Sequence, residues 1–191
     1  MSIATSLRRA RLNSGVSLRH TATAAGVGAS SLSNIESGRR EPTSGTVERI
    51  AETLGVRVAV IPRVDRLTAA DAAETIATYA GAEPATAYRA FLQLADDLAG
   101  ADPYEQFLLT VEQPRRLGNR WDDAIAALVE LRLPKSSVPP WAAKHNTAPG
   151  EPVWEPQRTP FPLPALTDLS EAPEPFRRRG VAISAGELES V

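Results

Sequence analysis

The sequence ASSLSNIESGRREP, residues 29–42, decides the fold of the first third of the chain. Its only large apolar residues are Leu32 and Ile35, three positions apart, so a helix formed here can bury one narrow face. The other side chains are mostly short hydroxyls and one amide. An ordinary solvent face carries Glu and Lys, because these residues favour helix and stay hydrated. The stretch therefore predicts a helix whose polar face makes a close contact.

The end of the stretch indicates the kind of contact. Gly38 is expected to end the helix in a left-handed cap, and Arg39 and Arg40 follow where a phosphate strand could run. Short hydroxyl and amide groups suit a face that presses into a groove and exchanges hydrogen bonds with base edges and phosphates. Residues 29–38 thus indicate a recognition helix and its exit.

Further helices are expected around the recognition helix. Ser17 is a natural N-cap, because its hydroxyl can accept a first-turn amide, and Gly26 supplies a tight turn. The expected helices cover residues 3–14, 17–25, 29–37 and 43–54. The β-branched stretch VRVAVIP, residues 56–62, predicts a short strand. This strand either pairs with its two-fold mate in a dimer or is an extended connector.

Residues 15–56, GVSLRHTATAAGVGASSLSNIESGRREPTSGTVERIAETLGV, resemble the Cro and phage-repressor type of helix-turn-helix. In that family Gly-x-Ser opens the second helix, Gly-Val marks the turn, and Ile-Glu-x-Gly-Arg-Arg-x-Pro closes the third. The resemblance begins at residue 3. It implies a repressor that binds a double-stranded, palindromic DNA operator as a homodimer. It also implies a buried ion pair between Arg11 and Glu36 that ties the first helix to the third.

The resemblance further implies which residues contact DNA. Base contacts are expected from Ala29, Ser30 and Asn34, and backbone contacts from Ser17, Ser37 and Arg39. The expected set is completed by Arg19, Arg40, Ser31 and Ser33.

The sequence departs from the family at three positions. Leu18 and Ala29 stand where the family often has Gln or Arg, so a bidentate base contact is missing there. Base specificity is then expected to depend on Asn34, on thymine-methyl contacts from Ala29 and on DNA shape. Thr21 replaces a usual core Leu.

The net charge differs between the predicted helix-turn-helix segment and the rest of the chain. Residues 1–63 carry nine arginines against four glutamates, a net charge of +5. Residues 64–191 carry twelve basic against nineteen acidic residues, a net charge of −7. A basic head on an acidic body favours contact between the head and a polyanion. The alternative is an uneven surface charge without a partner.

The middle of the chain predicts a second set of helices. Thr68 with Asp71, and Asp102 with Glu105, are expected N-terminal caps. The expected helices cover residues 68–79, 84–98, 102 to before Pro114, and 121–133, and their apolar stripes predict a core. The expected fold is mainly α, with an N-terminal helix-turn-helix bundle of four to five helices, a helical middle region and a proline-rich, extended C-terminal tail. The expected domains are residues 1–63, 64–133 and 134–191.

The tail contains eleven of the sixteen prolines between residues 134 and 175. It is expected to run extended, either draped over the body or disordered until bound. VAIS, residues 181–184, predicts a strand, and Ser184 is expected to cap a last half-turn with Glu187. The apolar residues beyond the prolines imply docking on their own body or on another chain, and the three neighbouring arginines either join it or are solvated. The expected partner-binding residues are Phe176, Arg177, Arg178, Arg179, Val181, Ile183 and Leu188.

Residues 115–191 resemble the C-terminal region of actinobacterial helix-turn-helix antitoxins that are paired with nucleotidyltransferase-type toxins. The shared features are RWDDAIAALVELRLP, residues 120–134, a proline-rich spacer, and a terminal PFRRRGV, residues 175–181. The resemblance implies a toxin protein as partner and repression of the chain's own promoter. The alternative is a stand-alone repressor whose helical body senses a ligand or sets the oligomeric state.

Other functional classes find little support in the sequence. The chain has no cysteine, and its two histidines, His20 and His145, are isolated, so neither a metal site nor a catalytic triad is expected. Solvation explains the pair Asp96-Asp97, and helix dipole and solvation explain Asp122-Asp123. We therefore expect no enzyme activity, cofactor or metal. Without an apolar stretch of about 18 residues, no membrane contact is expected, and the location is expected to be cytoplasmic and nucleoid-associated.

Overall fold

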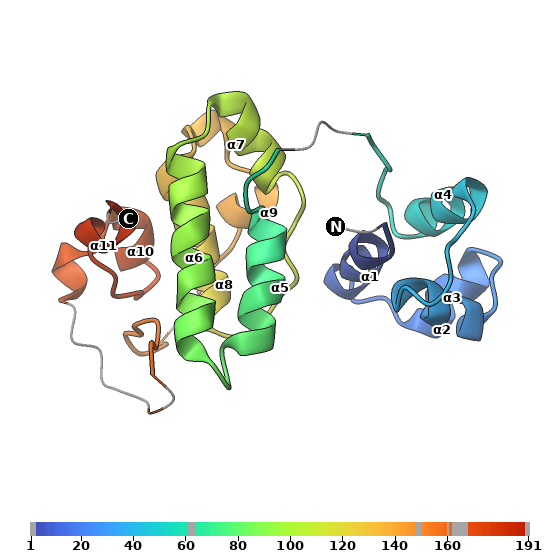
Figure 1. Cartoon of the computed structure of the whole chain (residues 1–191), viewed down its shortest axis with the longest axis horizontal. Coiled ribbons are helices and arrows are strands. Elements are labelled where there is room, and N and C mark those ends of the chain that lie inside the picture. The colour runs from blue at the N-terminus through green and yellow to red at the C-terminus, as the bar shows by residue number, and fades with distance from the viewer. Residues whose placement is uncertain (1–2, 61–63, 148–149, 160, 162–167, 190–191) are drawn as a thin grey trace. The chain divides into compact units, whose positions relative to one another are not determined.

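The computed structural model describes residues 3–60, 64–147, 150–159, 161 and 168–189. The chain divides into two compact units, Met1–Pro62 and Arg63–Val191, here called the N-terminal unit and the C-terminal unit. Within the described residues the regular structure consists of eleven α-helices and two short 3-10 helices, without a strand (Figure 1). The predicted mainly helical fold is confirmed. No helix in these ranges is long and apolar enough to cross a bilayer.

The N-terminal unit is a bundle of four helices. They are α1 (Ile3–Asn13), α2 (Leu18–Ala24), α3 (Ala29–Glu36) and α4 (Ser44–Thr53), and each end lies within one residue of the predicted one. Nine buried residues form the core: Leu7, Ala22, Ala25, Leu32, Ile35, Val47, Ile50, Ala51 and Leu54. Leu32 and Ile35, the two large apolar residues of α3, are both buried there, as their spacing predicts.

The C-terminal unit contains the remaining helices. They are α5 (Ala69–Tyr79), α6 (Pro84–Ala99), α7 (Pro103–Thr110), α8 (Arg120–Arg132), α9 (Pro140–Ala143), α10 (Glu174–Arg177) and α11 (Ala185–Glu189), with 3-10 helices at Lys135–Ser137 and Leu169–Glu171. The predicted caps are present: Thr68 Oγ1 accepts from Asp71 N at 3.0 Å, and Asp102 and Glu105 form a capping box. Helices α5 and α6 lie side by side as a hairpin (Figure 1).

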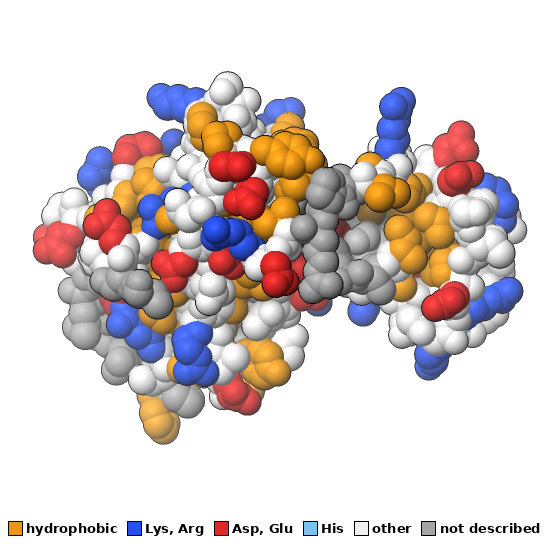
Figure 2. Space-filling view, turned by 45° about the horizontal axis from the view of Figure 1, so that its top comes forward, with side chains coloured by type: hydrophobic (Ala, Val, Ile, Leu, Met, Phe, Trp, Pro, Cys, Tyr) orange, Lys and Arg blue, Asp and Glu red, His pale blue; other side chains and the backbone are white. Residues whose placement is uncertain are grey.

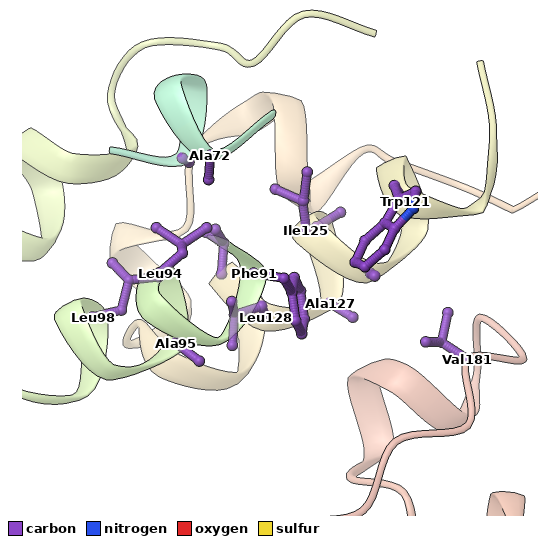
Figure 3. Close-up of a cluster of buried hydrophobic side chains, with 14 of the residues drawn as sticks. Ala72, Phe91, Leu94, Ala95, Leu98, Trp121, Ile125, Ala127, Leu128 and Val181 are labelled. Carbon is purple, nitrogen blue, oxygen red and sulfur yellow. The ribbon is translucent and has the colours of Figure 1, made fainter. Parts of the chain in front are cut away.

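Aromatic side chains connect the segments that form the core of the C-terminal unit. In Figure 3, residues of α6 such as Phe91 and Leu94 pack with Ile125 and Leu128 of α8, and Val181 points towards this cluster from the C-terminal segment. The ring centroid of Phe91 lies 5.7 Å from that of Trp121 and 6.4 Å from that of Phe176. The ring of Trp121 also meets Trp154 edge-on at 5.2 Å. Residues beyond position 150 therefore complete the core.

Two strand predictions differ from the structure. Residues 56–60 belong to neither a helix nor a strand, and Ile61 and Pro62 lie outside the described residues. In the predicted strand 181–184, only a single parallel bridge joins Val181 to Trp154. Its hydrogen bonds run from Trp154 N to Gly180 O at 2.9 Å and from Ala182 N to Trp154 O at 2.8 Å. An isolated bridge forms because no neighbouring segment extends it into a ladder.

The described part of the proline-rich stretch lies on the helical body. Pro140 begins α9, and Ala142 of this helix is buried in the core of the C-terminal unit. The guanidinium of Arg120 holds the later part of the stretch by donating to the carbonyl of Pro152, and it also donates to the carbonyls of Arg179 and Gly180 after the stretch. The described residues of the stretch therefore agree with the prediction that it runs over the helical body. Residues 148–149, 160 and 162–167 lie outside the described ranges.

The acidic pairs of this unit are not explained by solvation alone. The sequence predicts a solvated Asp97, but its carboxylate is buried and accepts from Leu67 N at 2.7 Å and from Gln93 Nε2 at 3.2 Å. Asp123 is buried as well, and Asp122 accepts from the backbone amides of Leu117 and Gly118 before α8. The buried carboxylates of Asp97 and Asp123 are retained inside because hydrogen bonds satisfy them, whereas Asp122 is only partly buried.

Candidate nucleic-acid interface

Helix α3 presents a short polar face opposite its buried side. Ala29, Ser30 and Ser37 are exposed, whereas Ser33 and Asn34 are half-buried. Burial of Leu32 and Ile35 fixes the rotation of α3 about its axis, so these positions point outward together. The face contains no long side chain that would hold a groove at a distance.

The C-terminal end of α3 has the geometry that Gly38 predicts. Gly38 has a φ of +72°, and its amide donates to Ile35 O at 2.9 Å. The amide of Arg39 donates to Asn34 O at 2.9 Å, which completes a Schellman motif. The exposed Arg39 and Arg40 leave the helix here, and Arg40 Nη1 donates to Ser31 Oγ at 2.9 Å. The motif thereby fixes the path of the two arginines relative to the polar face.

Helix α2 and the turn after it hold α3 in place. Ser17 caps α2, because its hydroxyl accepts from His20 N at 3.2 Å. Gly26, with a φ of +65°, makes the turn between α2 and α3. Thr21, which replaces an apolar residue of the family, is fully buried and donates its hydroxyl to Ser17 O at 3.2 Å. This hydrogen bond lets a polar side chain occupy the core.

A buried ion pair ties α1 to α3, as the resemblance implies. Arg11 Nε donates to Glu36 Oε1 and Arg11 Nη2 donates to Glu36 Oε2, both at 2.7 Å. Arg11 Nη1 also donates to Val16 O at 3.2 Å. The hydrogen bonds with Glu36 raise the pKa of Arg11, so the guanidinium keeps its proton. The predicted Arg11–Glu36 pair is confirmed.

The surface charge of the N-terminal unit is positive. Two of its arginines, Arg9 and Arg11, are buried, and Arg11 is neutralised by Glu36. Six described arginines are exposed: Arg8, Arg19, Arg39, Arg40, Arg49 and Arg57. Only Glu41, Glu48 and Glu52 oppose them at the surface of the described part of this unit. Figure 2 shows basic side chains projecting at several points around the unit.

The predicted partner-binding residues lie in the C-terminal unit, mostly inside it. Phe176, Val181, Ile183 and Leu188 are buried in its own core. Arg178 and Arg179 both pair with Glu130 of α8, and Arg179 is only 3% exposed. Arg177 alone of the set is exposed without a carboxylate partner among the ion pairs of the described residues. The sequence leaves open whether the apolar residues after the prolines dock on their own body or on another chain. In the structure they pack in the core of their own unit.

Sequence inspection missed the polar network that joins α8 to the chain after it. Asp123 Oδ1 accepts from Thr147 Oγ1 at 2.8 Å and lies 2.7 Å from His145 Nε2. Asp123 Oδ2 accepts from Arg120 Nε at 2.7 Å. The i, i+3 spacing of Arg120 and Asp123 signals only the local pair. Nothing in the sequence indicates that His145 and Thr147 reach the same carboxylate.

Comparison with known proteins identifies the first of the two units. Residues 2–64 match the model of a family described as a helix-turn-helix domain, and this segment contains every residue of the predicted DNA-binding set. Neither a curated protein nor a solved structure matches the chain. Residues 2–64 thus form a helix-turn-helix domain, which indicates that the protein is a DNA-binding regulator of transcription.

Proposed function

We propose that the protein is a transcriptional repressor that binds a palindromic operator as a homodimer and reads it with α3. The observation that carries the proposal is the outward face of α3, whose short side chains lead directly to Arg39 and Arg40. Ala29, Ser30 and Asn34 are the proposed base contacts, while Ser17, Arg19, Ser37 and Arg39 contact phosphates. Ser31, Ser33 and Arg40 complete the interface.

Uncapped amides at the start of α3 support a phosphate contact there. Gly28 is the N-cap of α3 and offers no side-chain acceptor to the first turn. First-turn amides and the positive end of the helix dipole favour a phosphate oxygen. An exposed Ala29 directly after this cap leaves room for a close approach of the DNA backbone.

The alternating valines of residues 56–60 support the proposed dimer. Val56, Val58 and Val60 recur at every second position and are all exposed. A strand contributed by each copy would bury these side chains against one another and satisfy the open backbone groups. Val58→Asp is expected to shift the protein from dimer to monomer in sedimentation velocity. A monomeric wild-type protein at micromolar concentration would contradict the dimer.

Operator selection from a random duplex library tests DNA recognition. The full chain is expected to enrich a palindrome with half-sites about 34 Å apart. Asn34→Ala should relax the preference at one base pair in each half-site, whereas Arg39→Ala should weaken all duplexes alike and flatten the salt dependence. Arg89→Ala, an exposed arginine of α6, is the matched control and should leave both properties unchanged. Selection without any enriched motif would overturn the proposal.

A second candidate function is neutralisation of a nucleotidyltransferase-type toxin, with repression of the shared promoter. Exposed apolar side chains in the C-terminal unit favour partner binding, above all Phe161, which is 78% exposed, and Val153. The acidic charge of residues 64–191 would suit a basic partner. The proposed partner surface comprises these residues and Arg177.

A growth assay with the full chain tests this second function. Removal of residues 134–191 would also remove core residues such as Phe176, so point variants are the cleaner choice. Co-expression with a nucleotidyltransferase encoded beside the gene should rescue growth. Phe161→Ser with Val153→Ser should lose the rescue but keep operator binding in a gel shift. Failure of the wild-type chain to rescue growth would exclude the antitoxin function for that partner.

A further inference from the structure

A cavity of about 310 Å³ opens in the C-terminal unit, away from the predicted DNA-binding residues in sequence. It is bounded by the segment 113–116, by the first half of α8 and by α9 with the two residues after it. This volume lies at the lower end of the range of small-molecule sites. Ile125, Ala126, Pro114, Pro140 and Trp141 give it an apolar lining.

Basic side chains line the same cavity although the surrounding unit is acidic. Arg115, Arg116 and Lys144 contribute three positive charges, whereas residues 64–191 carry a net charge of −7. Lys144 forms no ion pair with any carboxylate in the described ranges. Arg115 has only a long contact, 3.9 Å from Nη1 to Glu74 Oε2, between two half-exposed side chains. Such a contact contributes little.

The acidic group in the cavity lining is already engaged. Asp122 accepts from Leu117 N at 2.9 Å and 3.1 Å and from Gly118 N at 2.9 Å. Asp122 forms no ion pair with the basic residues of the lining among the described residues, so its charge offsets only one of the three positive charges. Without His145, the residues of the cavity lining have a formal charge of +2.

The walls of the cavity are fixed by hydrogen bonds before any ligand enters. Trp141 Nε1 donates to Thr110 O at 2.9 Å, which holds the indole ring against the end of α7. His145 Nε2 lies 2.7 Å from Asp123 Oδ1, which holds the residues after α9 to α8. A preformed site loses less conformational entropy on binding. Apolar walls with a cationic lining match a molecule that has an apolar body and a negative group.

We propose that this cavity binds a small aromatic or aliphatic carboxylate, whose apolar body contacts Trp141 and Pro140 and whose carboxylate pairs with Lys144, Arg115 and Arg116. Arginine and lysine side chains form charge-assisted hydrogen bonds with a carboxylate. An inorganic anion alone would leave the apolar walls without a partner. The site would make the C-terminal unit the ligand-binding part of the regulator.

The two lysines of the chain allow a direct test, because Lys144 lines the cavity and the exposed Lys135 does not. Reductive methylation with ¹³C-formaldehyde labels both lysines and keeps their charge, and Lys144→Gln assigns the signals. Titration of the full chain with benzoate should shift the Lys144 signal to saturation and leave the Lys135 signal in place. The neutral benzamide should not produce this shift.

Calorimetry of unlabelled protein completes the test. Lys144→Gln should weaken benzoate binding about fivefold, equivalent to roughly 1 kcal/mol, whereas Lys135→Gln should not change it. Inorganic phosphate should bind at least about tenfold more weakly than benzoate. Equal binding of benzamide, equal binding of phosphate, or a shift of both lysine signals would overturn the proposal. DNA plays no part in these measurements, so their outcome is distinct from that of operator selection.

Discussion

The two units of the protein build their cores in different ways. The N-terminal unit has no Phe, Trp or Tyr, and its core consists of Leu, Ile, Val and Ala from four short helices that follow one another directly. The C-terminal unit contains all the aromatic residues of the chain and places Phe176 and Val181 against α6 and α8. The first core is therefore specified by local sequence, and the second by contacts between distant segments.

The restriction of aromatic residues to the C-terminal unit supplies a spectroscopic probe of that unit. Trp121, Trp141 and Trp154 all lie in the C-terminal unit, so tryptophan fluorescence follows the unfolding of that unit alone. Far-ultraviolet circular dichroism follows the helices of both units. A substitution that destabilises one unit should therefore change the unfolding transition seen by one of the two signals, or separate the fluorescence transition from the dichroism transition.

The largest effect is expected from Phe176→Ala. Phe176 is fully buried and meets Phe91 edge-on, so truncation leaves a cavity that costs about 4 kcal/mol. The urea midpoint measured by fluorescence should fall sharply, while binding of DNA by the N-terminal unit persists. Phe107→Ala is the matched control, because Phe107 is 49% exposed and should change stability by less than about 0.5 kcal/mol. Equal urea midpoints for Phe176→Ala and wild type would contradict the inference that the C-terminal segment completes the core of this unit.

Glu36→Gln should have the next largest effect and should act on the other unit. The substitution leaves the buried guanidinium of Arg11 without its charge partner, at a cost of about 3 kcal/mol. The dichroism transition should acquire an early phase, while the fluorescence midpoint stays at the wild-type value. Glu52→Gln, at an exposed position of α4, should leave both transitions unchanged. Movement of the fluorescence midpoint by Glu36→Gln would show that the units do not unfold independently.

These contrasts also explain what the sequence could predict. The eight longest helices, the caps at Ser17, Thr68 and Asp102, and the Gly38 terminus all depend on residues within a few positions of one another. The Arg11–Glu36 pair was accessible only through the family resemblance. Other features depend on how distant segments of the chain pack together. These are the packing of Phe176 in the core, the contacts of Asp123 with His145 and Thr147, and the basic cavity. Periodicity predicts that a residue is buried, but not against which segment.

The Asp123 network gives a pH-dependent contribution to the C-terminal unit. Burial raises the pKa of Asp123, but hydrogen bonds from His145, Thr147 and Arg120 outweigh burial and hold this pKa below its ordinary value. The folded state therefore binds the proton more weakly than the unfolded state. The resulting stabilisation is present above about pH 4, the pKa of an unfolded aspartate, and is lost as the pH falls through the lower folded value.

Asp123→Asn should remove that part of the pH dependence. At pH 7 the expected loss is about 2 kcal/mol, because Arg120 keeps its carbonyl partners and is not left wholly uncompensated. Urea midpoints by fluorescence between pH 3 and pH 7 should show a shallower slope for the variant than for wild type. Asp96→Asn, next to the buried Asp97 but itself half-exposed, is the control and should keep the wild-type slope. Parallel slopes for Asp123→Asn and wild type would contradict the depressed pKa.

The smallest effect, of opposite sign at two positions, is expected from alanine substitutions of glycines in the N-terminal unit. At Gly38 the φ of +72° strains any residue with a Cβ atom, and no atom lies within 4 Å of the place that such a Cβ would take. The cost of Gly38→Ala is therefore conformational, about 1 kcal/mol. At Gly45, inside the first turn of α4, a Cβ would approach only the flexible end of Arg49 at 3.9 Å. Gly45→Ala should consequently stabilise the unit by about 0.5 kcal/mol, because alanine has the higher helix propensity.

Thermal unfolding by circular dichroism measures both glycine variants, and operator binding separates strain from recognition. Gly38→Ala should lower the unfolding temperature of the N-terminal unit and weaken operator binding, because the Schellman motif sets the exit of Arg39 from α3. Gly45→Ala should raise the unfolding temperature and leave operator binding unchanged, since α4 contributes no residue to the proposed interface. Equal and same-signed shifts at the two positions would mean that the left-handed backbone at residue 38 is not what ends α3. Because both changes add the same methyl group, only the backbone conformation distinguishes them.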